Sequence, residues 1–590
     1  MLQRGLLVGV SAACLNTLHA QQLPKESGHS LGKVTTHGDL VVVELDEGVL
    51  AKENLFDLTG RTLRFTPSRF GYRVHNSDLH WENDIGPELT AGNVTLHQFH
   101  FPYGGKTWDK FLVGPNGSIR FGLTEEKAAL DPYGKKGGGI SFDRFDQLGK
   151  AGSTFGHNAP VICVFFKPRL FGPRYAKEMA DRIVVTWNLT EPFGNLIDFG
   201  WFKTVNRFQT ILYRDGSIEM SYKEIAAKDA IIGLYPFAPT GGNKGTSPKE
   251  VHFSSVQAED GPFPALFESF HYFAPPNPKD LACTVLQVLG DKFDLLAYYS
   301  DFRIDSQEAS SPSEGPLGNK VKGIGPTDPE DPVSFCSAGR LQLTYQQPIF
   351  VGANEMQLQP PENALRGSPQ DITFYRSELE AASPDGKLRP YDYAMTHLGH
   401  EWSHRWGAYV SAKVKGKTIP LGPIHWLKGL RAPVAFPYQR PVEASTLGGG
   451  VWQHNADGTY TQLRDGYFVP APGYSYLDLY LMGLLSPEEV PDFFLLQNLV
   501  AVGKDRYGRA IFKADRIRLT IQAVVAAEGS RVPDFEHSQR EFNTGIVVLV
   551  QHGQMPSPEL LERADGIRRQ WIEYWKTTTG GRATMATSPR

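Results

Sequence analysis

Three residues in the second half of the chain have the types and the spacing needed to activate a water molecule. They are His400, Glu401 and His404, which together form an H-E-x-x-H motif. On an α-helix, side chains four positions apart lie on one face, so the two imidazoles can bind one metal ion. A carboxylate beside them can accept a proton from water. The motif therefore predicts zinc as the cofactor and Glu401 as the catalytic general base.

The stretch around this motif resembles the zincin metallopeptidases. Gly407 also matches the H-E-x-x-H-x-x-G start of the metzincin branch, but Val410 occupies the position of that branch's third ligand and cannot bind zinc. In the gluzincin branch the third ligand is an acidic residue on a second, downstream helix. For this chain the resemblance implies Asp478, in the segment S-Y-L-D-L-Y-L-M-G.

Alternatives to Asp478 as the third ligand remain open. Ser475 lies three residues before it, so Asp478 also fits a helix capping box. His425, in G-P-I-H-W, is the alternative third ligand, and His454 is a weaker candidate.

Further polar residues are candidates for supporting the metal ligands or a developing oxyanion. His397 falls on nearly the same helix face as the motif histidines, where it can hold a ligand in place or face solvent. Tyr474, Tyr480 and His537 are candidates for the oxyanion role.

Three helices are expected to position these residues. The motif helix begins near Pro390 and ends before Lys415-Gly416. Its apolar stripe is expected to be buried: Ala394, Leu398, Trp402, Trp406 and Tyr409. A second helix begins at Ser475 and ends near Ser486-Pro487. A last helix begins around Pro558, with its apolar face made by Leu560, Ala564, Ile567, Trp571 and Tyr574.

The first half of the chain reads as β structure. Residues 40–45, 62–66 and 183–187 form short apolar runs that are typical of strands. Asn116-Gly117 and Asp215-Gly216 lie between such runs and predict tight hairpin turns. Many short strands joined by turns indicate a β-sandwich. From about 90 to 240 the chain also resembles β modules of secreted multidomain proteins, which implies a binding or packing role.

Composition and the N-terminus indicate where the protein works. The net charge of −4 over 590 residues, without a long basic run, gives no sign of a nucleic-acid partner. Arg4, the apolar run from Leu6 to Leu15 and a cleavage site after Ala20 predict an export signal, and no segment has the length of a transmembrane helix. Lipid attachment at Cys14 is a lesser alternative.

Three cysteines remain after the expected signal, and an odd number cannot all pair, so this is no disulfide scaffold. Cys163 lies in an apolar run and is expected to be a buried free thiol. Cys283 and Cys336 flank a loop-rich segment, and we predict that they pair in an oxidising compartment.

Together these features predict a multidomain chain with an N-terminal all-β sandwich and a C-terminal α/β (α+β) zincin-like metallopeptidase domain. The expected boundaries are a signal peptide (1–20), a β-sandwich region (21–274), a Pro-rich linker (275–280), the zincin-like domain (281–576) and a flexible tail (577–590). The expected function is secreted zinc-dependent peptidase activity on a protein or peptide substrate. The alternative is a non-enzymatic surface or adhesion protein whose zincin-like part is an inactive scaffold. The resemblance over residues 290–585, to large secreted bacterial zincin-like proteins, supports export and the zincin-like fold.

Overall fold

The structure is a computed structural model, and all structural statements concern the residues that it describes. These are 30–50, 52–122, 160–167, 170, 172–191, 204–236, 248–257, 260–273, 276, 278–290, 292–300, 302, 321–325, 348–351, 392–403, 405–407, 409–422, 425–438, 445–465, 473–506 and 509–589.

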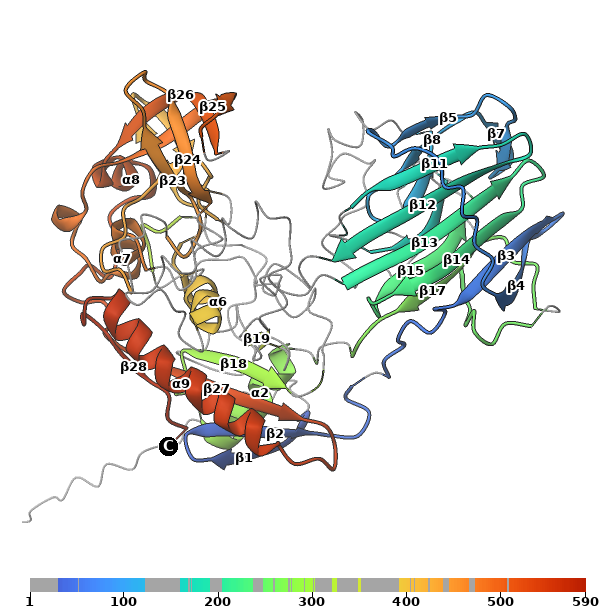
Figure 1. Ribbon diagram of the computed structural model, residues 1–590. Helices are drawn as coiled ribbons and strands as arrows, with labels where there is room; N and C mark the ends of the chain where they lie inside the picture. Colours follow the sequence, from blue (N-terminus) through green and yellow to red (C-terminus); the bar gives the residue numbers. More distant parts are fainter. Residues whose placement is uncertain are drawn as a thin grey trace, which may run out of the picture.

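Two β-sheets pack face to face to form a sandwich (Figure 1). The six-stranded sheet has, in spatial order, β11 (Arg174–Glu178), β12 (Arg182–Glu191), β13 (Thr204–Tyr213), β14 (Ile218–Ile225), β3 (Arg61–Ser68) and β4 (Gly71–Asp78). The seven-stranded sheet has β16 (Lys249–Glu250), β17 (Leu266–Phe270), β15 (Ala230–Tyr235), β10 (Val161–Phe166), β9 (Ser118–Phe121), β8 (Lys110–Val113) and β5 (Asn93–Thr95). A small hairpin, β6 (Phe101–Tyr103) and β7 (Lys106–Trp108), also contributes to this core.

The sandwich forms where the short apolar runs and the turn signals predict it. One face of each sheet supplies aromatic residues to a shared core, among them Trp187 and Phe208, whose rings stack 5.2 Å apart. Both predicted hairpins are confirmed, because β8–β9 turns at Asn116-Gly117 and β13–β14 turns at Asp215-Gly216. Cys163 is a buried free thiol on β10, as expected.

The two ends of the sandwich meet. Asn54 and His271 form an antiparallel bridge, with N···O distances of 2.9 Å and 2.7 Å for its two hydrogen bonds. The chain therefore enters and leaves the sandwich at one point.

A second, mainly parallel sheet combines strands from both ends of the chain. Its order is β1 (Gly32–His37), β2 (Leu40–Leu45), β27 (Glu541–Val550), β18 (Leu295–Ser300) and β19 (Pro348–Val351), with β28 (Thr584–Ala586) paired to β27. The β2–β27, β27–β18 and β18–β19 pairs are parallel, whereas β1 is antiparallel to β2.

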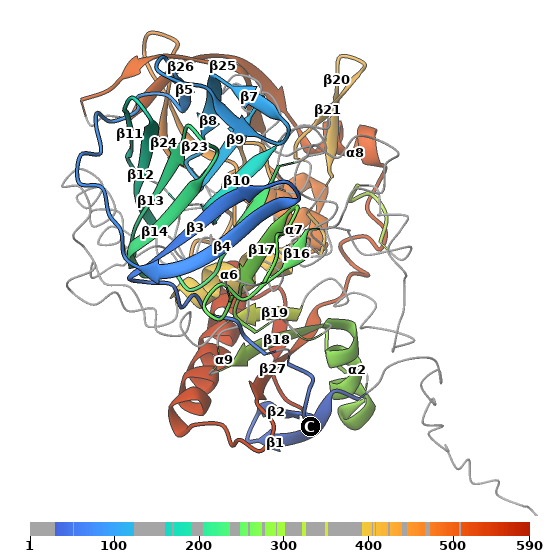
Figure 2. The same ribbon diagram turned by 90° about the vertical axis from the view of Figure 1, so that its right-hand side faces the viewer.

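Helices cover both faces of this sheet (Figure 2). Helix α2 (Pro278–Leu289) packs on the face that presents Val41, Val43 and Tyr298. Helices α6 (Asp392–Ser403) and α9 (Pro558–Thr578) pack on the opposite face. Such parallel strands are buried on both sides, which explains the continuous apolar run of β2.

Three expected boundaries differ from the structure. Strands β1 and β2, expected in the sandwich region, belong to the sheet of the second half, because β2 pairs with β27. The expected linker at 275–280 overlaps the start of α2, since proline fits the first turn of a helix. The expected tail after residue 577 instead continues α9 to Thr578, turns at Gly580-Gly581 with positive φ, and adds β28 to β27.

The remaining elements form an antiparallel layer beyond α6. A five-stranded sheet has β22 (Leu430–Arg431), β25 (Phe493–Lys504), β26 (Ala510–Leu519), β24 (Tyr460–Asp465) and β23 (Gly450–His454) in spatial order. Helices α7 (Tyr476–Met482) and α8 (Ile521–Glu528), and the short 3₁₀ helix η4 (Pro487–Glu489), adjoin it. The predicted capping box is confirmed, with Ser475 as N-cap of α7 and Asp478 as its partner. The predicted apolar face of α9 is also buried.

Helix α6 is shorter than the sequence pattern suggests. It ends at Ser403, and residues 411–420 form a hairpin of β20 (Ser411–Val414) and β21 (Lys417–Pro420) rather than helix. The hairpin turns at Lys415 and Gly416, which both have positive φ, as a two-residue turn between twisted strands requires. The apolar stripe nevertheless lies in the core up to Trp406, which is 3% exposed.

Two further expectations concern the membrane and the disulfide. Among the described residues, no helix combines the length and the apolarity needed to cross a membrane. Cys283 is disulfide-bonded, and Cys336, its predicted partner, lies outside the described residues.

Candidate functional site

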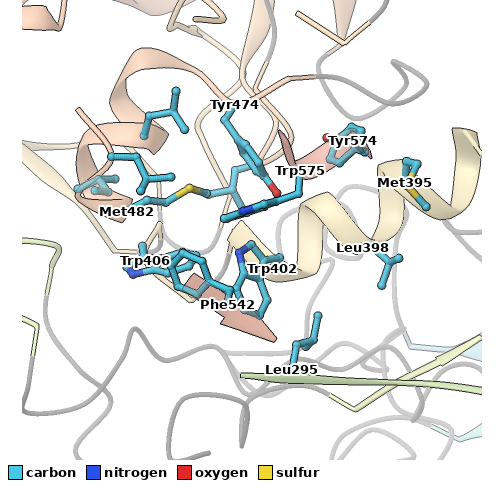
Figure 3. Close-up of a cluster of buried hydrophobic side chains, with 14 of the residues drawn as sticks. Leu295, Met395, Leu398, Trp402, Trp406, Tyr474, Met482, Phe542, Tyr574 and Trp575 are labelled. Atoms are coloured by element: carbon cyan, nitrogen blue, oxygen red, sulfur yellow. The ribbon is translucent and has the colours of Figure 1, made fainter. Parts of the chain in front are cut away.

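Helix α6 is held in the core by aromatic side chains. Trp402 contacts Trp406, Phe542 of β27 and Trp575 of α9 edge to face, with ring centroids 5.5–5.7 Å apart (Figure 3). Each such pair stabilises the fold by roughly 0.5–1.5 kcal/mol beyond the contribution of the surface area that it buries. Together they fix the end of α6 that carries the motif.

The chain just after α6 is fixed by a buried arginine. The Arg405 guanidinium lies 4.9 Å from the ring centroids of both Trp402 and Trp406. It also donates to a carboxylate oxygen of Asp294, at 3.4 Å. Arg405 directly follows His404 in the sequence, so this anchor acts next to the motif.

One nitrogen of the His400 imidazole is hydrogen-bonded to a backbone carbonyl. Its Nδ1 lies 2.7 Å from the carbonyl oxygen of Thr446. A carbonyl only accepts hydrogen bonds, so the neutral ring carries its proton on Nδ1. The lone pair of Nε2 therefore points away from Thr446, which is the tautomer that a metal-binding histidine uses.

His425 lies opposite that lone pair. The Nε2 atoms of His400 and His425 are 3.1 Å apart, and the two rings stack with centroids 4.9 Å apart. Burial lowers the pKa of His400, and burial followed by the proximity of His400 lowers the pKa of His425 to about 3. Both rings are therefore neutral near pH 7, the state in which imidazole binds metals.

Backbone contacts of its neighbours position His425. A side chain at Gly422 would collide with the backbone of His425, so this position requires glycine. On the other side, the Trp426 amide donates to the Leu447 carbonyl at 3.0 Å. The close approach of Gly422 and the Trp426–Leu447 hydrogen bond together restrict the position of the His425 backbone.

The spacing of the two imidazole nitrogens is close to that of two ligands of one zinc ion. Nitrogens that share a tetrahedral zinc at about 2.0–2.1 Å lie roughly 3.4 Å apart, close to the 3.1 Å seen here. Among the described residues, no group of three or more His, Cys, Asp and Glu side chains is gathered for a metal. His404 and the side chain of Glu401, which complete the motif, lie outside the described residues.

Asp478 is close to this site but faces other partners. Its Oδ1 accepts from the Trp426 indole nitrogen at 2.9 Å, and its Oδ2 accepts from the Ser475 amide at 2.6 Å. Its side chain is buried, with 2% of the residue exposed. Burial raises the pKa of Asp478, and hydrogen bonds from Ser445, Ser475 and Trp426 act in the opposite direction. The structure therefore brings His425, not Asp478, directly against His400.

The supporting candidates lie in different places. The Tyr474 hydroxyl, buried against α9, donates to the Gly399 carbonyl of α6 at 3.4 Å. Tyr480 lies on the far part of α7 near Arg531. His454 is exposed and stacks on Tyr460, and exposed His537 pairs with Asp534 at 2.6 Å. The side chain of His397 lies outside the described residues.

Three residues near the site were not singled out from the sequence. The Thr446 carbonyl accepts from His400, Trp426 donates to Asp478, and Ser445 lies beside Asp478 and lowers its pKa. Only Trp426 carried a sequence signal, as the bulky neighbour of His425. The role of Thr446 rests on its backbone carbonyl, which no side-chain pattern can reveal.

No family model matches the chain, and neither the curated proteins nor the solved structures give a match.

Proposed function

We propose that the protein is an exported zinc hydrolase that cleaves peptide bonds. His400, His404 and His425 would hold the metal, and Glu401 would serve as general base. The observation that carries this proposal is the His400–His425 pair, in which a carbonyl fixes one nitrogen and the other nitrogen faces a second neutral imidazole.

The proposed chemistry divides between the metal and the chain. A bound zinc ion supplies Lewis acidity towards a carbonyl oxygen and a water molecule. Glu401 takes the proton from that water and passes it to the leaving amine. The shielded surroundings of His400 and His425 keep both rings neutral, so that they bind metal rather than protons.

The proposed fold assignment follows from the same elements. A mainly parallel sheet with the motif helix packed on one face is the arrangement expected of a zincin-like α/β domain. Here His425 replaces Asp478 as the proposed third ligand, because both carboxylate oxygens of Asp478 accept other hydrogen bonds.

Export is proposed from the N-terminal segment alone. Cleavage after Ala20 would leave Gln21 as the first residue. Mass spectrometry of the protein recovered from the medium or periplasm of its producing cells tests this, and an intact Met1 in that material contradicts it.

Metal analysis and a single isosteric change test the proposed activity. Purified full-length protein should hold about one zinc ion per chain, and His400→Ala, His404→Ala and His425→Ala should each lose it. Glu401→Gln should keep the zinc and reduce cleavage of casein or of a peptide library by about 100-fold or more.

The exposed His454 provides the matched control, since His454→Ala should change neither zinc content nor cleavage. Unchanged turnover in the Glu401→Gln protein would sink the proposal. Absence of bound metal in the unmodified protein would instead favour a non-enzymatic surface or adhesion protein. Bound zinc without peptide cleavage would point to a hydrolase with another substrate.

A further inference from the structure

The carboxylate of Asp478 connects three segments that meet behind the histidine pair. It caps α7 through the Ser475 amide, it accepts the indole N–H of Trp426, and it lies beside the Ser445 side chain, which lowers its pKa. All three partners are donors from different parts of the chain. A carboxylate is the side chain that can accept from all of them, because it has two oxygens and no donor.

Two of these partners are next to the supports of the two histidines. Trp426 directly follows His425, and its amide is fixed to Leu447 at 3.0 Å. Ser445 directly precedes Thr446, whose carbonyl accepts the Nδ1–H of His400. Each of these two neighbours of Asp478 is thus adjacent in sequence to a residue of the pair or of its support: Trp426 to His425, and Ser445 to Thr446.

The segment from Ser445 to Leu447 is also tied to α6. The Ser403 and Thr446 hydroxyls lie 2.6 Å apart, and the Ser403 hydroxyl donates to the Gly399 carbonyl at 2.6 Å. Shifting this segment would move the Thr446 carbonyl relative to His400. A single displaced carboxylate would thus loosen both sides of the pair.

We propose that Asp478 is a positioning residue, whose carboxylate sets the relative placement of His400 and His425 through Trp426 and Ser445. The inference rests on the proposed function where it concerns metal, since metal-binding imidazoles depend on such outer hydrogen bonds. The placement itself belongs to the protein before any metal binds.

Substitutions that remove individual hydrogen bonds test this arrangement. Trp426→Phe keeps a ring but removes the indole donor, so it should loosen His425 alone. In Asp478→Asn the amide has one acceptor atom and a donating nitrogen, so it cannot serve Trp426, Ser445 and Ser475 together as the carboxylate does. This variant should loosen both histidines.

The reactivity of each histidine can be measured without metal. Chelator-treated full-length protein is exposed to diethyl pyrocarbonate, and carbethoxylation of His400 and His425 is quantified by mass spectrometry. We expect a roughly 5- to 10-fold faster reaction of His425 in Trp426→Phe, as loss of one buried hydrogen bond implies, and of both histidines in Asp478→Asn.

Two control variants separate positioning from general damage. Trp452→Phe removes a comparable buried indole, which donates to the Lys428 carbonyl at 2.9 Å, and should change neither histidine. Ser475→Ala removes the side-chain cap of α7 but leaves the Trp426–Asp478 bond, so it reports the effect of helix fraying alone. Far-UV circular dichroism checks that every variant is folded.

Zinc affinity then distinguishes this inference from the proposed function. If the protein binds zinc, Asp478→Asn should weaken it by about 10- to 100-fold. If the unmodified protein binds none, the proposed function fails while the reactivity test still reports positioning. Unchanged reactivity of both histidines in folded Asp478→Asn overturns the inference. Complete loss of zinc with both histidines still protected would make Asp478 a ligand instead.

Discussion

At the scale of single residues, the site depends on which groups are buried together. His400 and His425 are both neutral because each would have to carry a charge into a poorly solvated site beside the other. Asp478 lies close by, but its carboxyl oxygens accept hydrogen bonds from Trp426 and Ser475. The same buried region therefore contains two neutral imidazoles and one hydrogen-bonded carboxyl group.

The lowered pKa of His425 predicts how stability depends on pH in the metal-free protein. In the unfolded chain this imidazole binds a proton near pH 6.5, whereas in the folded protein its pKa is about 3. The contribution of His425 to the free energy of unfolding is therefore fully present above about pH 6.5. It is lost as the pH falls towards 3, by up to about 1.4 kcal/mol per pH unit.

Urea unfolding in the presence of a chelator, at about pH 7 and about pH 5.5, measures this loss as a change in the free energy of unfolding. His425→Gln should lose less stability than the unmodified protein between these two values. His454→Gln, which changes an exposed histidine, should behave like the unmodified protein. Equal losses in the unmodified protein and His425→Gln would contradict the assignment.

Residue types and spacing predict only part of this site. The H-E-x-x-H spacing locates His400 on a helix, and the Ser475–Asp478 spacing predicts the cap that the structure contains. The choice between Asp478 and His425 depends on how two segments 52 residues apart pack around Trp426. No local pattern contains that information, because it arises from tertiary packing.

At the scale of elements, α6 and α9 pack closely enough to require a glycine. A Cβ built on Gly399 would lie 2.7 Å from the Tyr574 hydroxyl oxygen and 3.1 Å from its ring. Gly399 immediately precedes His400, so the close approach of the two helices determines how far the motif lies from α9.

Gly399→Ala should therefore destabilise the protein by about 1–3 kcal/mol, the usual cost of overpacking a core. Under the proposed function it should also weaken zinc binding, because α6 must move to relieve the clash. Gly503→Ala in β25 is the matched control, since a Cβ at this position would meet no atom within 4 Å. Chemical denaturation and zinc titration of both variants test this, and a Gly399→Ala protein as stable as Gly503→Ala would refute it.

The C-terminal strand is a second element whose removal has a definite expected result. Met585 on β28 is 6% exposed, and the Asn543 side chain donates to the Ser588 carbonyl at 3.2 Å. Ending the chain after Gly581 removes this pairing and exposes the side of β27 that β28 covers. We expect a lower thermal unfolding temperature, whereas a flexible tail would leave it unchanged.

Elements with strong local sequence signals were predicted well. The end of α6 and the presence of α2 were not. The apolar period of α9 and the hairpin turns at Asn116-Gly117 and Asp215-Gly216 are found where expected. The end of α6 was wrong because the apolar period continues to Trp406 although the helix stops at Ser403. Helix α2 was missed because prolines around residue 278 favoured a linker.

At the scale of the whole molecule, the sandwich is inserted into the fold of the second half. Strands β1 and β2 precede it in the sequence, but β2 lies beside β27, about 500 residues later (Figure 1). Prolines in the sequence mark the connection that leaves the sandwich after His271. The connection that enters it, between β2 and Asn54, has no such signal. The predicted order of two consecutive domains therefore assigned β1 and β2 to the wrong unit.

This arrangement predicts which shortened chains fold. Replacing residues 55–270 with a short Gly-Ser linker joins Asn54 to His271, which an antiparallel bridge already brings to within about 5.5 Å. The second-half unit then keeps all the strands of its sheet, and we expect cooperative unfolding and the zinc content of the full chain. A chain that starts at residue 276 lacks β2, whose five buried residues contact cores on both faces of the sheet: Leu40, Val41, Val42, Val43 and Leu45.

Burying side chains of this size contributes roughly 1.5–3 kcal/mol each, so their combined loss is comparable to the net stability of a typical domain. The chain from residue 276 should therefore fail to unfold cooperatively, while residues 52–273 alone should fold around their own core. Circular dichroism melting, size-exclusion chromatography and zinc analysis of the three proteins give the comparison. A stable, zinc-binding chain from residue 276 would show that β1 and β2 are dispensable and that the sandwich precedes an independent domain.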